Sequence, residues 1–384
     1  MSSIPMKRIA LNSNVGSYLR LSLIRGTMAA LDDRPDVELM LQDGMPFSDW
    51  ETVYREKPDA VITTLLNDDD VERAKQFKGV VVNVAEALPF CGVDSVIVDN
   101  RECGVIAGRH LHSTGVGHFG YIGVAGAVNS ERRLEGFLSQ LPDGGAEAFR
   151  LSLDRKDLNE WAKLVRKLRF WIEPLPKPVG LYVYSDVHAR AVIQAVRGLG
   201  LRVPIDVSVV GTGNYDLDAL ISRPHLSSVP LNLQKVAYLA ARYALKVVEG
   251  GRMPEVTKVP PRPIVVRGSS DHFFSEDEAV SKALHYIQNH HLGEVQVDDV
   301  AKASGVSRRV LEKRFRAATG SSVYSFVNNV RLRKAKVLLM ETDDTVEVVA
   351  QKSGFREARL LITALKKASG VTPGEYRRQV AIHA

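Results

Sequence analysis

The sequence predicts an α/β module built on parallel sheets, followed by an all-helical domain that carries two helix–turn–helix units. Three observations predict this division. Short β-branched runs alternate with amphipathic helical patterns from residue 8 to about residue 267. Beyond residue 276 the pattern is helical only. Within this helical part, a short motif occurs twice at a spacing of 49 residues, 300 to 349.

The first part of the chain orders its strand and helix candidates as βαβ units do. The strand candidates are 9–12, 60–63, 80–83, 119–124, 180–184 and 207–211. The amphipathic stretches lie near 17–32, 102–113, 130–140, 157–172, 187–199 and 233–249. This alternation predicts parallel sheets with helices on both faces. Roughly 260 residues are too many for one compact doubly wound sheet, so we expect two lobes.

A change of composition marks the end of this module. Residues 252–275 hold four prolines and then Gly268-Ser269-Ser270-Asp271, which is typical of a last strand and a linker. Beyond the linker we expect helices over 276–290, 298–304, 307–318, 322–340, 345–352 and 356–368. The sequence therefore predicts two domains, 1–270 and 271–384.

The internal repeat predicts two helix–turn–helix units. Val300-Ala301-Lys302-Ala303-Ser304-Gly305-Val306 recurs as Val349-Ala350-Gln351-Lys352-Ser353-Gly354-Phe355. Each copy reads as a short helix, a turn whose glycine can take a positive φ, and the start of a second helix. A second helix of this kind can enter a DNA major groove. The apolar residues that we expect to face inward on the second helices are Leu311, Phe315, Leu361 and Leu365.

The outward positions of these second helices predict a surface that reads DNA. Arginine can fork onto guanine O6 and N7, glutamate can accept from cytosine N4, and more distal lysines and arginines suit phosphates. The charge agrees, because residues 301–384 hold 17 Lys and Arg against 7 Asp and Glu, whereas the other 300 residues hold 34 against 38. The alternative is an ordinary solvated helix face. The candidate DNA-binding residues are Ser307, Arg308, Arg309, Glu312, Lys313, Arg316, Arg356, Arg359, Thr363 and Lys366.

With these motifs in place, residues 276–380 resemble the AraC/XylS-type DNA-binding domain. The resemblance implies that a long helix, here about 322–340, joins two helix–turn–helix units and places their second helices in successive major grooves. Leu361 and Leu365 depart from the family, which usually has phenylalanine there. The segments that carry the resemblance are Val306-Ser307, Arg331-Leu332-Arg333-Lys334-Ala335, Gly354-Phe355 and Gly370-Val371-Thr372-Pro373-Gly374-Glu375-Tyr376-Arg377.

The α/β module shows no motif for catalysis. Gly115-Val116-Gly117-His118-Phe119-Gly120 has the spacing of a dinucleotide loop, but these glycines follow a helix and lead into a strand, which is the reverse order. No nucleophile elbow and no phosphate-binding P-loop occur in the sequence. We expect neither an enzyme, nor a cofactor, nor a metal site. The histidines His110, His112, His118, His285, His290 and His291 lack partners at ligand spacing and are expected at the surface.

Residues 8–267 resemble the periplasmic-binding-protein-like sensor domain of LacI/GalR-type repressors. A LacI-type N-terminal helix–turn–helix has no counterpart before the first strand candidate. The order of the two parts, sensor first and AraC-type domain last, is similar to that of XylR-type xylose-responsive regulators. The segments that carry this resemblance are Val98-Asp99-Asn100, Gly115-Val116-Gly117-His118, Gly120-Tyr121-Ile122-Gly123, Arg133-Leu134-Glu135-Gly136-Phe137, and Val203-Pro204 with Asp206-Val207-Ser208-Val209-Val210-Gly211.

The sensor resemblance implies a small-molecule site at the strand ends, with a sugar as ligand. Arg133 matches a sugar-binding arginine, whose guanidinium can donate to two adjacent hydroxyls. Gly213 stands where many relatives carry an acidic residue beside Asn214. The alternative for each candidate is a strand-end cap or a surface residue. The candidate ligand residues carried over by position are Asn14, Glu86, Arg133, Asp186 and Asn214.

Together the resemblances imply a sequence-specific transcriptional regulator, controlled by a sugar such as xylose and acting as a homodimer on double-stranded DNA. An alternative is a regulator whose α/β module only dimerises, and a third is an enzyme acting on a sugar or nucleotide. The chain has only Cys91 and Cys103, which makes a disulfide framework improbable. No apolar run approaches the roughly 18 residues of a membrane span. We therefore expect a cytoplasmic protein.

Overall fold

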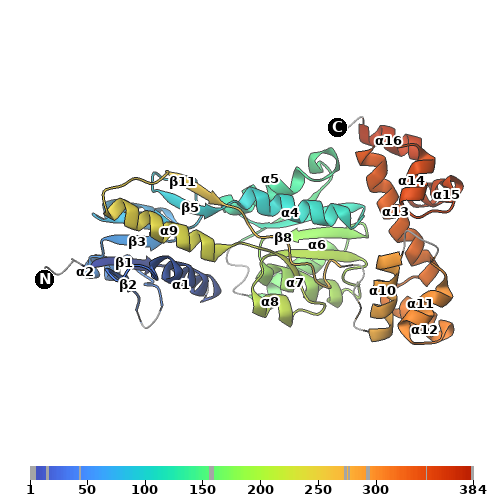
Figure 1. Ribbon diagram of the computed structural model, residues 1–384, viewed down its shortest axis with the longest axis horizontal. Coiled ribbons are helices and arrows are strands. Elements are labelled where there is room, and N and C mark those ends of the chain that lie inside the picture. The colour runs from blue at the N-terminus through green and yellow to red at the C-terminus, as the bar shows by residue number, and fades with distance from the viewer. Residues whose placement is uncertain are drawn as a thin grey trace. The chain divides into compact units, whose positions relative to one another are not determined.

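The computed structural model describes residues 6–13, 17–42, 45–154, 160–271, 275, 277–290, 295–342 and 344–381. The chain divides into two compact units, each assembled from three stretches (Figure 1). Unit 1 comprises Met1–Gly104, Val124–Gly136 and Val229–Pro263. Unit 2 comprises Val105–Gly123, Phe137–Ser228 and Ile264–Ala384. The chain therefore passes repeatedly from one unit to the other, and each unit is described by itself.

Unit 1 is built on a sheet with the strand order β11-β5-β4-β3-β1-β2. The neighbouring strands run parallel, and their apolar runs fit a sheet whose two faces are both covered. The last strand to be synthesised, β11, occupies the edge beside β5. The strands are β1 (Lys7–Asn12), β2 (Val37–Met40), β3 (Ala60–Thr63), β4 (Val80–Asn83), β5 (Ser95–Val98) and β11 (Val256–Val259).

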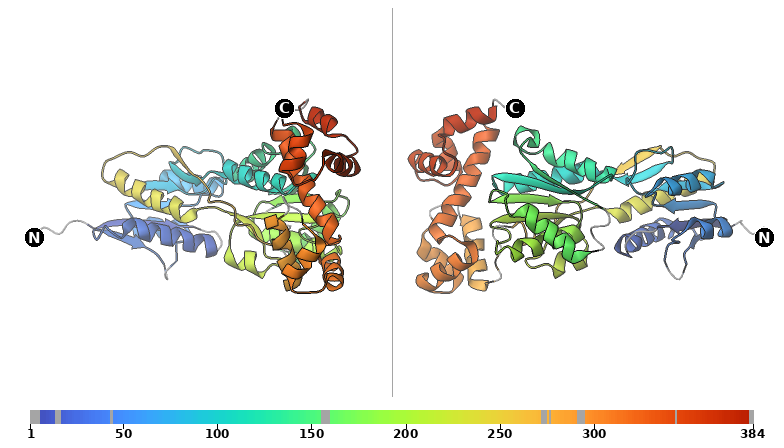
Figure 2. Two further views of the ribbon diagram at one scale, coloured as in Figure 1. Left: turned by 45° about the vertical axis from the view of Figure 1, so that its right-hand side comes forward. Right: turned by 180° about the vertical axis from the view of Figure 1, so that it is seen from behind.

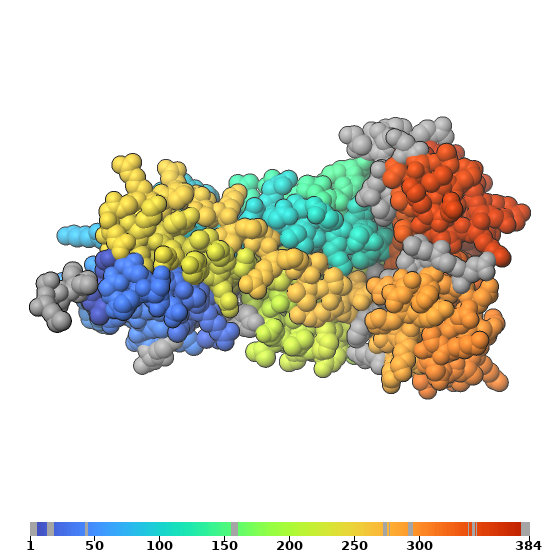
Figure 3. All heavy atoms as spheres, viewed as in Figure 1, coloured from blue at the N-terminus to red at the C-terminus, as the bar shows by residue number. Residues whose placement is uncertain are grey.

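Helices cover both faces of this sheet. The helices α2 (Trp50–Glu56) and α3 (Asp68–Gln76) pack on the face that carries Ala10 and Val61. On the other face α1 (Ser17–Leu31) and α9 (Leu233–Val248) lie side by side, as the adjoining blue and yellow atoms of Figure 3 show. The two helices approach closely at Gly26, where an added Cβ would collide with the backbone of α9.

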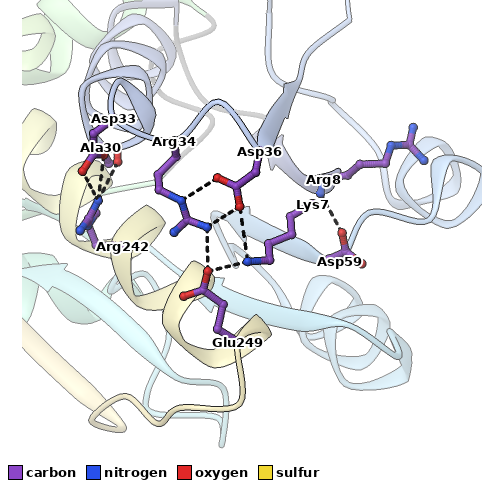
Figure 4. A network of polar contacts seen from close by, with 9 residues as sticks. All are labelled: Lys7, Arg8, Ala30, Asp33, Arg34, Asp36, Asp59, Arg242 and Glu249. Atoms are coloured by element: carbon purple, nitrogen blue, oxygen red, sulfur yellow. Dashed lines mark hydrogen bonds and ion pairs between the residues drawn. The ribbon is translucent and has the colours of Figure 1, made fainter. Parts of the chain in front are cut away.

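A network of charged side chains ties β1 and the end of α1 to the end of α9 (Figure 4). Arg34 donates from Nε and Nη2 to the two carboxylate oxygens of Asp36, each at 2.8 Å. Its Nη2 also donates to Glu249 at 2.7 Å, and Lys7 donates to the same carboxylate. The hydrogen bonds from Arg34 hold the pKa of Asp36 far below its usual value. Because these groups are partly exposed, we expect the network to add little to the free energy of unfolding. Its main effect should be to fix the position of the end of α9 against β1.

Unit 2 contains a second sheet, with the strand order β10-β9-β8-β6-β7. The pairs β6–β8 and β8–β9 are parallel. The strands are β6 (His118–Val124), β7 (Phe149–Leu153), β8 (Val179–Val183), β9 (Val207–Gly213) and β10 (Ser227–Pro230). The helices of this α/β part are α4 (Asn100–Ser113), α5 (Val128–Leu138), α6 (Trp161–Ile172), α7 (Asp186–Gly198) and the short α8 (Asp216–Ile221), with a 3-10 turn at Pro142–Gly145.

Both faces of the second sheet are also covered. The helices α6 and α7 share one apolar core with β8 and β9. On the opposite face Phe137 of α5 packs on Tyr182, with ring centroids 5.4 Å apart, and Leu111 of α4 lies over Gly180. The helices α4 and α5 each begin in unit 1 and end in unit 2. They are therefore continuous elements shared by the two units.

The described residues after 277 form helices only, drawn in orange and red in Figure 2. They pack into two apolar cores that share the longest helix, α13: residues 323–330 belong to one core and residues 332–339 to the other. The helices are α10 (Glu278–His290), α11 (Val297–Ser304), α12 (Arg308–Thr319), α13 (Val323–Glu341), α14 (Val346–Lys352), α15 (Ala358–Ser369) and α16 (Pro373–Ala381).

The predicted fold class is confirmed: two parallel sheets with helices on both faces precede an all-helical part. The predicted strands correspond to β1, β3, β4, β6, β8 and β9. The strand β11 lies within 252–275, where a last strand was predicted, whereas the short strands β2, β5, β7 and β10 and the helices α2, α3, α8 and α16 were not predicted. The domain division 1–270 and 271–384 stays a prediction. In the part of the chain described above, no helix is both long and apolar enough to cross a membrane.

Candidate functional site

The start of helix α4 carries a buried polar cluster in unit 1. Asp99 accepts a hydrogen bond from the backbone N–H of Glu102 at 3.1 Å and so caps the helix. The next residue, Asn100, is only 4% exposed. Its Oδ1 accepts from Nε of Arg133 at 2.9 Å, and its Nδ2 donates to Oε2 of Glu86 at 2.9 Å. We call Glu86, Asn100 and Arg133 the α4 cluster.

The α4 cluster brings together two of the residues that the sequence predicted, through one that it did not. Arg133 and Glu86 were candidates, whereas Asn100 appeared only within the Val98-Asp99-Asn100 motif. The signal that could have found Asn100 is its place directly after a capping aspartate, at the carboxyl end of β5.

Arg133 is a buried charged residue. It is 5% exposed, and beside it the thiol of Cys103 is fully buried. Burial raises the pKa of this thiol to about 12, although the charge of Arg133 acts in the opposite direction. Charged groups are rarely buried unless they are paired or functional. The cluster offers guanidinium donors, an amide and a carboxylate acceptor, a set that suits the hydroxyl groups of a sugar.

A cavity of about 480 Å³ opens beside the cluster within unit 1. Glu86 lines it together with Phe90, Glu131 and Lys258, and its floor includes the β5 residue Ile97. Arg133 and Asn100 are not among the lining residues. The cavity therefore meets the α4 cluster at Glu86, and its size falls within the range of small-molecule pockets.

Asp186 occupies a different environment in unit 2. It is the first residue of α7 and is fully buried. Its Oδ1 accepts from the hydroxyl of Ser228 at 2.6 Å, and its Oδ2 accepts from the backbone N–H of Tyr215 at 2.7 Å. Burial raises the pKa of Asp186 to about 6, although both hydrogen bonds act to lower it. The carboxylate thus holds β10 and the end of β9 to the start of α7.

The end of β9 places the candidate Asn214 next to this carboxylate. The backbone N–H of Asn214 donates to Ser228 Oγ at 2.9 Å. Its side-chain Oδ1 is buried and accepts no hydrogen bond from any residue that the structure describes. Gly213 has a φ of 126°, and a Cβ there would lie 2.6 Å from the ring of Tyr215. This backbone conformation and packing account for a glycine at this position. Asn14 lies outside the described residues.

The two helix–turn–helix units have the predicted internal packing. In the first, α11 ends at Gly305 with a φ of 70°, and Ser307 caps α12 by accepting from the backbone N–H of Val310. In the second, Gly354 has a φ of 87°. The inward residues Leu311, Phe315, Leu361 and Leu365 are all fully buried. The two leucines that replace the family's phenylalanines therefore still fill a core.

The candidate DNA-binding residues lie on the solvent side of α12 and α15 or just before these helices. Glu312 is half-buried. Arg308 forms a 3.3 Å ion pair with Asp298, and Arg359 forms a 3.6 Å pair with Glu357. Exposed pairs of this kind are weak, so phosphates can compete for both arginines. The exposed candidates are Ser307, Arg308, Arg309, Lys313, Arg316, Arg356, Arg359, Thr363 and Lys366.

Sequence reasoning missed the apolar part of this surface. Val310 on α12 is 39% exposed, and Leu360 and Ile362 on α15 are 41% and 37% exposed. Exposed apolar side chains beside base-reading arginines can contact the methyl group of thymine. The signal was present in the sequence, because these residues adjoin Arg309, Arg359 and Thr363 on the same helices.

The histidines differ in their environments. His110 is half-buried rather than exposed, with its Nε2 2.7 Å from Ser270 Oγ, and burial lowers its pKa. His285 and His290 are exposed on α10, and His291 lies outside the described residues. Within the described ranges, no three His, Cys, Asp or Glu side chains are placed to hold a metal ion.

Comparisons with known proteins agree with both parts of this architecture. Residues 109–270 match the periplasmic binding protein-like domain family, and residues 300–379 match a helix-turn-helix domain family. The xylose operon regulatory protein of Escherichia coli K12 is 30% identical over 300 residues, which are 77% of this chain and 76% of that protein. The corresponding protein of Haemophilus influenzae is 26% identical over 288 residues, 73% and 74% of the two chains.

Solved structures give the same result for the fold. A structure described as the xylose-binding transcription activator xylR matches with a TM-score of 0.63 and 25% identity, over 99% of both chains. A LacI-type regulator from Alkaliphilus metalliredigens, solved with D-xylulofuranose, matches 69% of this chain with a TM-score of 0.53 and 16% identity. The 30% identity to the Escherichia coli protein over about three quarters of both chains shows that this chain belongs to the family of the xylose operon regulatory proteins and is a DNA-binding transcriptional regulator.

Proposed function

We propose that this regulator binds a monosaccharide of the xylose type through its α/β module, and that the bound sugar changes its affinity for DNA. The observation that carries the proposal is the chain of hydrogen bonds from buried Arg133 through Asn100 to Glu86. The names of the relatives, xylose operon regulatory proteins and a xylose-binding activator, support the choice of xylose.

The chemistry of the candidate residues suits a polyol. A guanidinium such as that of Arg133 donates to two adjacent hydroxyl oxygens, and the carboxylate of Glu86 accepts from hydroxyl hydrogens. In unit 2, the buried Oδ1 of Asn214 is an acceptor that a hydroxyl could use. Asp186 already accepts two hydrogen bonds from its own unit. In this proposal Asp186 therefore supports the site rather than contacting the sugar.

The DNA-binding role falls to α12 and α15. In this proposal Arg309 and Arg359 read base edges, while Lys313, Arg316 and Lys366 contact the phosphates. The exposed apolar residues on the same helices would contact thymine methyl groups. Each helix–turn–helix unit would therefore contact bases with both polar and apolar side chains.

The remaining features of the proposal follow from the family. We infer a homodimer, and the exposed Leu21 and Met28 lie seven residues apart on one side of α1, where a second copy could cover them. We infer two domains, 1–270 and 271–384, that act where the chromosome lies, in the cytoplasm. We expect no enzymatic turnover, because the relatives are transcriptional regulators.

The first test is sugar binding by the full chain. Titration calorimetry with D-xylose should show a saturable heat in the wild type, and Arg133→Ala should abolish it. Arg101→Ala is the matched control, because Arg101 is an exposed residue of α4 that pairs with Glu135. DNA binding without sugar should remain measurable in all three proteins, which shows that each is folded. An absence of heat with xylose and related pentoses would reduce the α/β module to a dimerisation role.

The second test concerns base reading. Arg309→Ala should remove about 1–3 kcal/mol of discrimination at one base pair of the operator, measured as the ratio of Kd values for matched and substituted DNA. Arg314→Ala is the control, because Arg314 lies on the same helix but pairs with Asp277. Equal discrimination by Arg309→Ala and wild type would remove Arg309 from the base-reading set.

A further inference from the structure

The C-terminal end of helix α4 is followed by a contact with α13, the helix that joins the two helix–turn–helix units. The backbone carbonyl of Thr114, just past the last residue of α4, accepts from Nη1 of Arg333 at 3.0 Å. Arg333 lies in the middle of α13. The next residue, Gly115, has a φ of 73°, and a Cβ there would collide with the aliphatic stem of Arg333. The loop after α4 is thus shaped to receive this arginine.

Arg333 is an unusual residue for a DNA-binding domain. Its side chain is half-buried, and the loss of solvent around the guanidinium lowers its pKa to about 10. No carboxylate in the described ranges pairs with it. Its charge instead faces the carboxyl end of α4, where the helix dipole is negative. An arginine that is satisfied by a helix end depends on the position of that helix.

One other contact joins the same regions of unit 2. A Cβ added at Gly320, which ends α12, would collide with the guanidinium of Arg202. The helical part therefore contacts the α/β part at α13 and at the end of α12.

The N-terminal end of α4 belongs to the α4 cluster. Asn100, the first residue of the helix, is bonded to both Arg133 and Glu86. The helix runs without interruption from Asn100 to Ser113, 14 residues, which corresponds to about 21 Å. One continuous helix therefore begins with a residue of the α4 cluster and is followed directly by the backbone carbonyl that binds Arg333.

We propose that α4 carries the response: a change in the hydrogen bonds of Asn100 moves the helix, and the Arg333 contact passes this movement to α13 and the two helix–turn–helix units. The identity of the sugar in this proposal rests on the proposed function, whereas the route from Asn100 through α4 to Arg333 does not. A sugar hydroxyl that takes over the Asn100 or Glu86 hydrogen bond alters the support of α4 at its start. Arg333 is then a positioning residue, which contacts neither sugar nor DNA bases.

The first experiment tests the route without sugar, by a double-mutant cycle in the full chain. Asn100→Asp keeps the acceptor for Arg133 but places a carboxylate against Glu86, so it should change the Kd for operator DNA by about fivefold or more. In the Arg333→Ala background the same substitution should change the Kd less than twofold. The proposal is overturned if Asn100→Asp has no effect on the Kd in the wild type, or has the same effect in both backgrounds.

The second experiment adds D-xylose and separates coupling from binding. Arg333→Ala and Gly115→Ala should bind xylose within twofold of the wild type, while the ratio of DNA Kd values with and without xylose falls toward 1. Lys334→Ala controls for the loss of charge on α13. Gly200→Ala controls for backbone strain, since Gly200 also has a φ of 73° but an added Cβ there meets nothing within 4 Å. Both controls should keep the wild-type ratio.

The outcomes distinguish the two proposals. If the wild type does not bind xylose, the proposed function fails. The double-mutant cycle without sugar still tests whether α4 couples Asn100 to Arg333. If xylose binds and Arg333→Ala keeps the full ratio, the route through α4 is wrong while the proposed function stands. Arg333→Lys retains the charge but not the full reach, so it should give an intermediate ratio.

Discussion

Glu86 and Asp186 are two carboxylates whose positions after strands predict the same role, that of a ligand residue. In the structure their environments are opposite. Glu86 is half-exposed, lines a cavity, and its carboxylate accepts a hydrogen bond from Asn100. Asp186 is fully buried and accepts from Ser228 and Tyr215 with its two oxygens. The first carboxylate is available to a ligand, whereas the second is already used by the fold.

This difference shows what position in a sequence can and cannot predict. Both residues follow buried strands, and both lie near the carboxyl ends of their sheets, as the parallel topology requires. Whether a side chain there faces a ligand depends on its partners, which come from distant segments. Ser228 lies 42 residues after Asp186, and no local sequence pattern predicts that the two side chains form a hydrogen bond.

The largest expected effect is that of Asp186→Ala. This change leaves the hydroxyl of Ser228 and the N–H of Tyr215 buried without their acceptor. We expect a loss of about 2–5 kcal/mol in the free energy of unfolding, measured by urea denaturation. A loss below about 0.5 kcal/mol, the range of ordinary surface substitutions, would show that the carboxylate is not structural.

Asp186 should also make stability depend on pH. Its pKa is about 6 in the folded state against an ordinary value of 3.8, so between about pH 4 and 6 the folded protein holds a proton that the unfolded chain releases. The contribution of Asp186 to stability therefore falls as the pH rises through this window, by about 3 kcal/mol in total. Denaturation of the wild type and Asp186→Asn at pH 4, 5, 6 and 7 would measure it. A constant difference between the two proteins would contradict the raised pKa.

The smallest expected effect on stability is that of Glu86→Gln. The glutamine oxygen can still accept from Asn100, so the free energy of unfolding should change by less than about 1 kcal/mol. Sugar binding should nevertheless weaken, because an amide accepts from a hydroxyl less strongly than a carboxylate does. Denaturation and calorimetry on the same protein would show the two effects apart. A large loss of stability would make Glu86 structural like Asp186, and the comparison would fail.

Much of the fold could be predicted from the sequence, for identifiable reasons. The repeated helix–turn–helix motif predicted both apolar cores, and Leu311 and Leu361 are fully buried as expected. The longer strands and amphipathic helices were found by their periodicity. The four-residue strands β3 and β4 were found because each is a continuous β-branched run, whereas β2 and β10, which lack such a run, were missed. The helix α16 was missed although Pro373 at its first position is a typical start.

The candidate site was predicted only in part. Arg133 and Glu86 were found by position, but the residue between them, Asn100, was not. The contact of Arg333 with Thr114 joins residues 219 positions apart, and nothing in the basic run of α13 distinguishes Arg333 from its neighbours Arg331 and Lys334. Its proposed role follows from its contact with Thr114, which the sequence pattern of α13 does not reveal.

The discontinuous construction of unit 1 has a consequence for biosynthesis. Lys7 and Glu249 are bonded across 242 residues, and both α9 and the edge strand β11 are made long after β5. On the ribosome, the first strands must wait for these late segments before their sheet can be covered. A chain truncated before β11 would expose the β5 edge, a template for aggregation. Nascent chains of this protein should therefore depend on chaperones until residue 259 has emerged.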